Sequence, residues 1–278
     1  MTEFSRTQYN FNNRIILNDV TTDTTKYIIT GVPAASDTVV LNTEDEKPEQ
    51  AGIIDYGSKL GRGVFVFPAT LFATTTAKMN ELIQDLKEAL NPDLLEADPT
   101  YGDGTKYYGY HPLEWTEDVG ATSRAFRVFA KPKEIPQVAT DSLSGNIRRT
   151  TLEFKVADPR KYLQTQSTLS GAGTAANAGT YTTPVVITVT ASGATSTSLT
   201  ITNSTTGESI YVTTALSNGQ VLVIDTGSHS VKLDGTETRS MLSGTSTWWL
   251  LNPGNNTLAI SNSTNASVSF AWYSAWPL

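Results

Sequence analysis

The sequence contains no cysteine and only two histidines among its 278 residues. Without cysteine the chain has no disulfide, no thiolate nucleophile and no thiolate ligand for a metal ion. His111 and His229 fall in opposite halves of the chain, and a catalytic triad would need one of them beside a serine and a carboxylate. His111 precedes Pro112 in an aromatic segment, and His229 ends the turn 226–229. We expect a structural role for the first and a solvated loop position for the second, and we assign no catalytic residue.

Basic clusters and long apolar runs are missing as well. The formal net charge is −7, and no cluster of Lys and Arg is longer than a pair such as Arg148-Arg149. We therefore expect no binding to nucleic acid or to an anionic membrane surface. No apolar run reaches the roughly 18 residues of a membrane-spanning helix, and the polar start at residues 1–6 lacks the apolar stretch of a secretory signal. A soluble protein made in a cytoplasm is expected.

Motifs for ions and phosphates are also absent, so no metal or cofactor site is assigned. Residues 98–104, Asp-Pro-Thr-Tyr-Gly-Asp-Gly, lack the alternating oxygen ligands and closing glutamate of an EF-hand, which favours a plain Asp/Gly turn. Residues 57–63 are rich in glycine but lack the Gly-Lys-Ser/Thr ending of a phosphate loop, which favours a hairpin or contact loop. An enzyme with two converging carboxylates, as in a glycosidase, stays open because any two acids would serve.

The charged residues that are present stop abruptly after residues 157–162, Ala-Asp-Pro-Arg-Lys-Tyr, which we call the boundary motif. Residues 1–162 carry 18 Lys and Arg and 23 Asp and Glu. The next 116 residues carry only two basic and four acidic side chains, are about one-third Ser and Thr, and hold four of the five tryptophans. Two domains are predicted, at 1–162 and 181–278, joined by a Ser/Thr/Gly-rich linker at 163–180.

The first domain is predicted to consist of short antiparallel strands, because apolar and polar residues alternate between turn-forming residues. The expected strands are 4–11, 14–17, 27–29, 39–41, 53–56, 64–67, 107–110, 124–130 and 151–156. Residues 53–56 and 64–67 are expected to pair with each other, and residues 43–50 to form a charged loop.

One amphipathic helix is predicted in this domain. Threonines at 74–76 offer N-caps, apolar residues recur at helical spacing from Met79 to Leu90, and Asn91-Pro92 ends the pattern. Since its apolar stripe must be buried and most other segments predict strands, the helix should cover one face of a β-sheet.

The second domain is predicted to be a β-sandwich. Strands are expected at 185–189, 198–202, 209–212, 220–225, 230–233, 247–251, 256–261 and 267–272, a spacing typical of sandwiches and barrels. Trp248 and Trp249 are adjacent on one of these strands, so their side chains should point to opposite faces and one should fill the core. Because aromatic faces stack on sugar rings, both are candidate glycan contacts, and a carbohydrate-binding adhesin is the alternative function.

Four local patterns are similar to one known family. They are the aromatic-rich opening 4–17, the helix leading to Leu94-Leu95 and an aromatic strand with Tyr107, Tyr110 and Trp115, the strand 152–156 with the boundary motif, and the turn 252–258 before a Ser/aromatic strand and a terminal tryptophan. In order and spacing they resemble the distal tail protein (Dit) family of long-tailed, siphovirus-type bacteriophages. The long linker and the loop 43–50 depart from the family pattern.

The resemblance implies a fold and a function. The expected fold is an N-terminal antiparallel β-sandwich, the belt domain, with one helix, followed by a C-terminal galectin-like β-sandwich. The expected function is a non-enzymatic structural hub of a tail tip or baseplate, in a homohexameric ring that joins the tail tube to the host-adhesion apparatus. The implied location is the virion, after assembly in the host cytoplasm.

The same resemblance implies partners. They are other copies of the chain, the tail tube protein, the tape-measure protein, the tail-associated hub protein, and a receptor-binding protein or cell-surface glycan. Lys59 and Arg62, in the glycine-flanked segment 53–67, are the candidate ring contacts.

Overall fold

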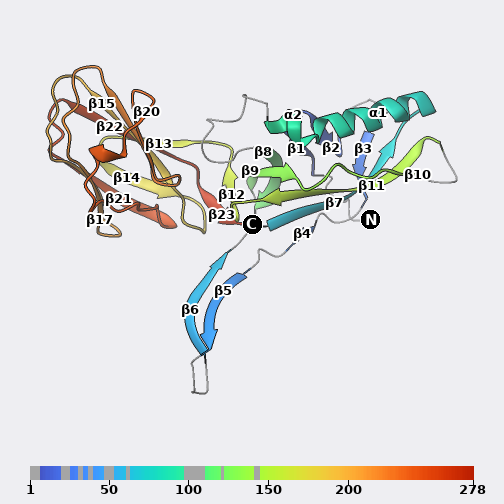
Figure 1. Cartoon of the computed structure of the whole chain (residues 1–278), viewed down its shortest axis with the longest axis horizontal. Helices are drawn as coiled ribbons and strands as arrows, with labels where there is room; N and C mark the ends of the chain where they lie inside the picture. The colour runs from blue at the N-terminus through green and yellow to red at the C-terminus, as the bar shows by residue number, and fades with distance from the viewer. Residues whose placement is uncertain are drawn as a thin grey trace. The chain divides into compact units, whose positions relative to one another are not determined.

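The computed structural model describes residues 7–19, 26–30, 34–36, 40–46, 53–60, 63–96, 110–119, 122–140 and 145–278 (Figure 1). The chain is mostly β, as predicted, and it divides into two compact units. The N-terminal unit is Met1–Lys161 together with Leu278, and the C-terminal unit is Tyr162–Pro277.

The strands of the N-terminal unit form one antiparallel sheet in the order β2-β1-β8-β9-β11-β7-β3, with β4 beside β7 and β10 beside β11. Their bounds are β1 (Tyr9–Phe11), β2 (Ile15–Leu17), β3 (Lys26–Ile29), β4 (Ala34–Ser36), β7 (Gly63–Phe72), β8 (His111–Val119), β9 (Thr122–Pro132), β10 (Ala139–Thr140) and β11 (Ile147–Val156). Asn12 and Asn13 form the first turn in the left-handed region, with φ of 51° and 53°, which asparagine tolerates better than most residues.

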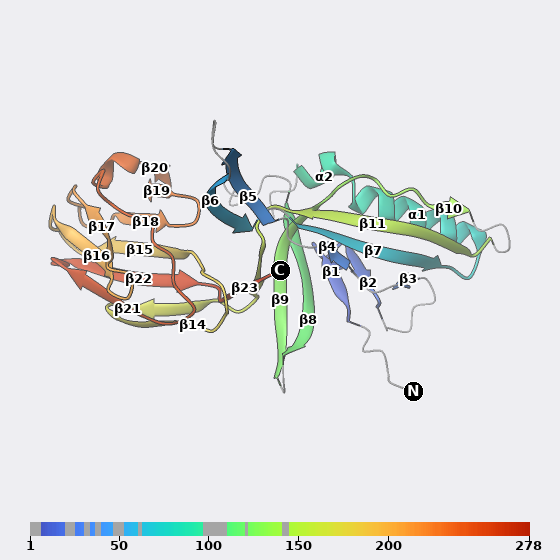
Figure 2. The ribbon, with the colours of Figure 1, turned by 90° about the horizontal axis from the view of Figure 1, so that it is seen from below.

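This sheet bends over onto itself. Although β8, β9 and β11 separate β1 from β7 in the sheet order, the rings of Tyr9 and Phe67 lie 4.9 Å apart between centroids. Phe11 contacts Phe154 of β11 in the same way, at 4.8 Å. Figure 2 shows β8 and β9 running steeply across β7 and β11. The inward residues of the two layers therefore share one aromatic core.

The predicted helix is confirmed as α1 (Thr76–Ala89). The Thr75 side chain caps it by accepting a hydrogen bond from the Lys78 amide at 3.2 Å. Its buried stripe faces the sheet, and the hydroxyl of Tyr27 on β3 donates to the Leu82 carbonyl at 3.0 Å (Figure 1). The helix ends before Asn91-Pro92, as predicted. A second short helix, α2 (Pro92–Glu96), follows at once, and the Asn91 side chain caps it by accepting a hydrogen bond from the Asp93 amide at 3.0 Å.

Two predictions for residues 40–67 are wrong. Strand β6 (Ile53–Leu60) pairs with β5 (Val40–Glu46), whereas β7 pairs with β11, β3 and β4, so residues 53–56 and 64–67 do not form a hairpin. Residues 43–46 belong to β5 and are not a loop. The rest of that expected loop, the turn at 98–104, the aromatic residues 107–109 and the start of the first strand lie outside the described residues.

The C-terminal unit is a sandwich of two antiparallel sheets, as predicted. One has the order β13-β22-β15-β18-β19-β20 and the other β14-β21-β16-β17. The bounds are β13 (Ser167–Ser170), β14 (Gly173–Asn177), β15 (Val185–Ala191), β16 (Leu199–Asn203), β17 (Glu208–Val212), β18 (Val221–Asp225), β19 (Ser230–Leu233), β20 (Thr236–Glu237), β21 (Gly254–Ser261) and β22 (Ala266–Trp272). Inward residues of both sheets, such as Ile187 and Ile201, form one core. Strand β12 (Arg160–Leu163) precedes this sandwich and β23 (Ala275–Pro277) follows it, and these two strands pair with each other.

The prediction that residues 163–180 form a linker is wrong. Residues in it form β13, which pairs with β22 through Leu169 and Phe270, and β14, which pairs with β21 through Ala175 and Asn256. Because edge strands with one solvated face tolerate Ser, Thr and Gly, their composition resembles that of a linker. Residues 247–251, predicted as a strand, instead run irregularly to a single bridge between Leu251 and Thr183.

Candidate functional site

The boundary motif forms half-buried ion pairs at the end of the N-terminal unit. Asp158 accepts two hydrogen bonds from the Arg160 guanidinium, from Nε at 2.7 Å and from Nη2 at 2.9 Å. Lys161 Nζ lies 2.7 Å from the Glu117 carboxylate and 4.6 Å from the centre of the Phe126 ring. The motif therefore has a structural role, since its charges are matched within the same unit.

Glu117 also acts on Tyr9, whose ring packs in the aromatic core. Burial of the phenol, and then the nearby negative charge of Glu117, raise the pKa of Tyr9 above its usual value. Tyr9 therefore stays protonated at neutral pH and offers no base or nucleophile.

The turn at 252–258 is held by a buried asparagine. Asn256 is fully buried, and its side chain accepts from the Asn252 amide at 2.9 Å while donating to the Asn252 carbonyl at 2.8 Å. Gly254 has a φ of 86°, which favours glycine there. The residues that suggested the family are thus needed for the turn itself.

The two histidines lie in different units and are not brought together. His111 is 3% exposed, and its Nε2 lies 2.8 Å from the Leu95 carbonyl, as a structural histidine would. His229 is exposed in the turn between β18 and β19. Among the described residues, no group of three or more His, Asp or Glu is placed to hold a metal ion. No described helix is long and apolar enough to cross a membrane.

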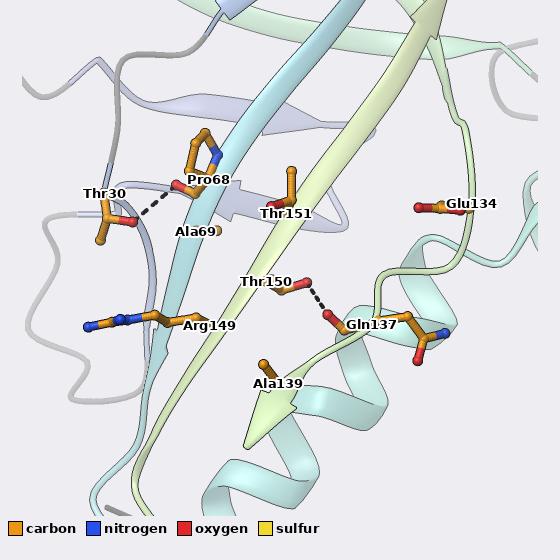
Figure 3. Close-up of a pocket in the computed structure, with 9 residues that line it drawn as sticks. All are labelled: Thr30, Pro68, Ala69, Glu134, Gln137, Ala139, Arg149, Thr150 and Thr151. Carbon is orange, nitrogen blue, oxygen red and sulfur yellow. Dashed lines mark hydrogen bonds between the residues drawn. The ribbon is translucent and has the colours of Figure 1, made fainter. Parts of the chain in front are cut away.

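An open pocket of about 470 Å³ lies on the N-terminal unit (Figure 3). Three threonines line it, and the hydroxyl of one of them, Thr150, donates to the Gln137 carbonyl at 2.8 Å. Its charged side chains, Arg149 and Glu134, lie on opposite sides of the pocket (Figure 3). No acid and base converge there, so the pocket geometry supports no reaction.

One of the two candidate ring contacts lies within the described residues. Lys59 is on β6, opposite Leu41 of β5 in the register, and Arg62 lies outside the described residues. Their role stays a prediction.

The tryptophans of the C-terminal unit are mostly core residues. Trp249 is 1% exposed, so it fills the core, as expected for one of the pair, and is no longer a candidate glycan contact. Trp272 is also buried, and its Nε1 donates to the Ala176 carbonyl at 3.0 Å. Trp248 is half-buried and contacts two side chains that the sequence did not suggest, His229 and Arg239. His229 and Arg239 come from separate segments of the chain, so no local pattern links them to Trp248. The one feature of the sequence that distinguishes them is the rarity of charged residues and histidine in this half.

Comparisons with known proteins agree with this architecture. Residues 178–276 match the family model described as the C-terminal domain of a siphovirus-type tail component. The solved structure of SPP1 Dit, described as a paradigm of the hub adsorption apparatus in phages that infect Gram-positive bacteria, matches with a TM-score of 0.65 and 13% identity, over 97% of this chain and 98% of that one. Two structures of the phage p2 baseplate, activated with Sr or Ca, give TM-scores of 0.46 and 0.43 at 9% identity, over 95% of this chain and 97% of theirs. No curated protein matches the sequence.

The C-terminal unit is therefore similar to one class of protein, the tail component of the siphovirus type. Within that class, the resemblance to the distal tail protein family is confirmed: the family model matches the C-terminal unit, and the fold of the chain is that of SPP1 Dit.

Proposed function

We propose that this chain is a non-enzymatic structural hub protein of a phage tail tip or baseplate. The observation that carries the proposal is the match to the Dit fold across 97% of the chain, together with the family model at 178–276. A hub of this kind resides in the virion, after assembly in the host cytoplasm. Its partners are the tail tube, tape-measure and tail-associated hub proteins, and a receptor-binding protein.

A homohexameric ring is part of this proposal, and the β5–β6 pair supports it. Among the described strands, β5 and β6 pair only with each other. An isolated two-stranded sheet is marginally stable in water, and its edges present unpaired backbone groups. A neighbouring copy would satisfy those edges, and a contact between two different surfaces closes into a ring when its rotation permits. Lys59 on β6 and the nearby Arg62 would contact that copy.

Light scattering across a concentration series tests the ring. The expected mass is six times the 30.0 kDa of the chain. Lys59→Glu and Arg62→Glu should each shift the mass toward the monomer, whereas Lys87→Glu, on the exposed side of α1, should not. A monomer at every concentration that also fails to form a ring with the tail tube protein would rule out the hexamer.

The second candidate function is a carbohydrate-binding adhesin that acts through the C-terminal unit. The observation that favours it is Trp248, a half-buried aromatic ring with polar neighbours in a sandwich rich in hydroxyls. A glycan array probed with the whole chain and with Trp248→Ala tests it. Failure of every glycan to bind would leave the hub role intact and remove the adhesin.

A further inference from the structure

Three uncommon side chains meet on the C-terminal unit, and we call them the tryptophan cluster: His229, Arg239 and Trp248. The His229 ring stacks on Trp248 with 5.0 Å between centroids and 15° between planes. The Arg239 guanidinium carbon lies 5.2 Å from the centre of the Trp248 ring. Arg239 is one of two basic residues after position 162, and His229 is the single histidine there. Two of the few basic or titratable nitrogen-bearing side chains of this unit therefore contact the same aromatic ring.

The backbone on both sides of Trp248 is fixed. The Thr247 amide donates to the Ser209 carbonyl of β17 at 2.9 Å, and the Ser209 amide donates to the Thr247 hydroxyl at 3.1 Å. On the other side, Trp249 is 1% exposed in the core. The Trp248 ring is therefore held in place before any ligand arrives.

His229 and Arg239 also lie on anchored segments. The turn before His229 is held by Asp225, whose carboxylate accepts from the Gly227 amide at 2.7 Å and from the Ser228 hydroxyl at 2.7 Å. Arg239 opens the 3₁₀ turn Arg239–Met241, and Met241 is 4% exposed in the core. Because these segments are already ordered, binding here would lose little conformational entropy of the backbone.

The cluster is rich in hydrogen-bond donors that lack acceptors. Arg239 and His229 are exposed, and across residues 145–278, which are all described, no side-chain hydrogen bond or ion pair is found for either of them or for the Trp248 indole. A guanidinium stacked on an aromatic ring keeps its N–H groups in its own plane, where they still bind an anion. A ligand with negative charge would therefore find N–H donors available at this cluster.

We propose that the tryptophan cluster binds an anionic saccharide, a sugar ring that carries a carboxylate or a phosphate. Arg239 holds the anion through two N–H groups, and the exposed ring of His229, which is stacked on Trp248, packs against the sugar ring. The proposal rests on the adhesin function and is independent of the hub role. Uronic-acid polymers and phosphodiester-linked wall polymers both supply this chemistry.

Ligand-observed saturation-transfer NMR on the whole chain tests the proposal, because it works for a monomer and for a large ring. The probes are a trimer of galacturonic acid, galactose 6-phosphate and, as the neutral match, a trimer of galactose. We expect saturation transfer to one or both anionic probes and weaker transfer to the neutral one. The anionic probe that responds identifies the source of the charge.

Single substitutions distinguish the contribution of the Arg239 charge to binding from that of the aromatic rings. Arg239→Gln should weaken binding of the anionic probe by about tenfold or more, since hydrogen bonds between charged groups exceed neutral ones. Lys232→Gln, at the other basic residue of the unit on β19, is the matched control and should change binding less than about twofold. Trp248→Ala should abolish the signal of both kinds of sugar, and a thermal melt by circular dichroism shows whether each variant folds.

The possible results distinguish the anionic-saccharide site from the adhesin function. If galactose binds as well as the acid and Arg239→Gln has no effect, the adhesin function stands and the anionic specificity is wrong. If Lys232→Gln weakens binding as much as Arg239→Gln, the charge acts at a distance and the cluster is not the site. If no probe binds, the cluster only holds the loops of the sandwich together and the anionic-saccharide site is wrong, while the glycan array still decides the adhesin function and the hub role is untouched.

Discussion

At the scale of single residues, the boundary motif shows how burial changes the contribution of an ion pair to stability. The side chains of Asp158 and Arg160 are 6% and 19% exposed in their ion pair, whereas those of Lys78 and Glu81 on α1 are 56% and 60% exposed. Water screens the exposed pair, but it cannot replace the hydrogen bonds of the buried one.

Asp158→Asn should therefore lower the free energy of unfolding by about 2–3 kcal/mol, because the guanidinium loses its charged partner in a partly buried position. Urea denaturation of the whole chain measures the loss. Glu81→Gln, which breaks the exposed pair, is the control and should cost less than about 0.5 kcal/mol. Equal effects of the two variants would show that the boundary pair is solvated.

Tyr27 gives the N-terminal unit a dependence on alkaline pH. Burial of its phenol, and then the nearby Asp85 carboxylate, raise its pKa above the ordinary value of 10.0. As pH rises past about 10, the unfolded chain loses this proton while the folded chain keeps it, so the free energy of unfolding falls. Below that pH both states are protonated, and Tyr27 contributes no pH dependence.

Tyr27→Phe should make that fall between pH 9 and 11 less steep and should cost about 1 kcal/mol at pH 7 through its lost hydrogen bond to Leu82. Part of the slope persists, because burial and Glu117 also raise the pKa of Tyr9. Urea denaturation at each pH measures the slope, with Tyr211→Phe at an exposed position for comparison. An unchanged slope in Tyr27→Phe would place the cause elsewhere.

At the scale of elements, periodicity predicted most strands and the helix, because burial of one face imposes a repeat on the sequence. Helix α1 and strand β19 were recognisable in this way. Pairing was less predictable, since it depends on contacts distant in sequence: β7 prefers β11 over the adjacent β6. Strands β13 and β14 were missed because few of their residues are large and apolar.

The corrected role of residues 163–180 makes a prediction about fragments. Residues 162–277 should unfold cooperatively as a sandwich, whereas residues 181–277 should melt at a markedly lower temperature or fail to fold. The shorter fragment lacks β13 and β14 and therefore exposes backbone groups of β22 and β21 that they pair with. Thermal melts followed by circular dichroism compare the two fragments. Identical midpoints would show that residues 163–180 behave as a linker.

At the scale of the whole molecule, the two-domain organisation was predictable from composition, but the candidate sites were only partly so. The sequence drew attention to Trp248, yet not to His229 and Arg239, because three separate segments bring them together. The tail-component class was recognisable because its turn needs particular residues, such as Gly254 and Asn256.

A hexameric ring would make thermal stability depend on protein concentration. Association of folded chains shifts the unfolding equilibrium by mass action, so the melting temperature should rise between about 1 and 100 µM. Scanning fluorimetry measures it, and Lys59→Glu should flatten the dependence. A melting temperature that is constant over this range, in a sample of monomeric mass, would contradict the ring.

The scarcity of charge in the C-terminal unit affects how the stability of each unit depends on the solvent. Only six Lys, Arg, Asp and Glu occur in the last 116 residues, and its core is held by apolar packing and buried asparagine hydrogen bonds. Ionic strength and mild acidity act mainly on charged groups. Changes in ionic strength or mild acidity should therefore alter the stability of this sandwich less than that of the charge-rich N-terminal unit.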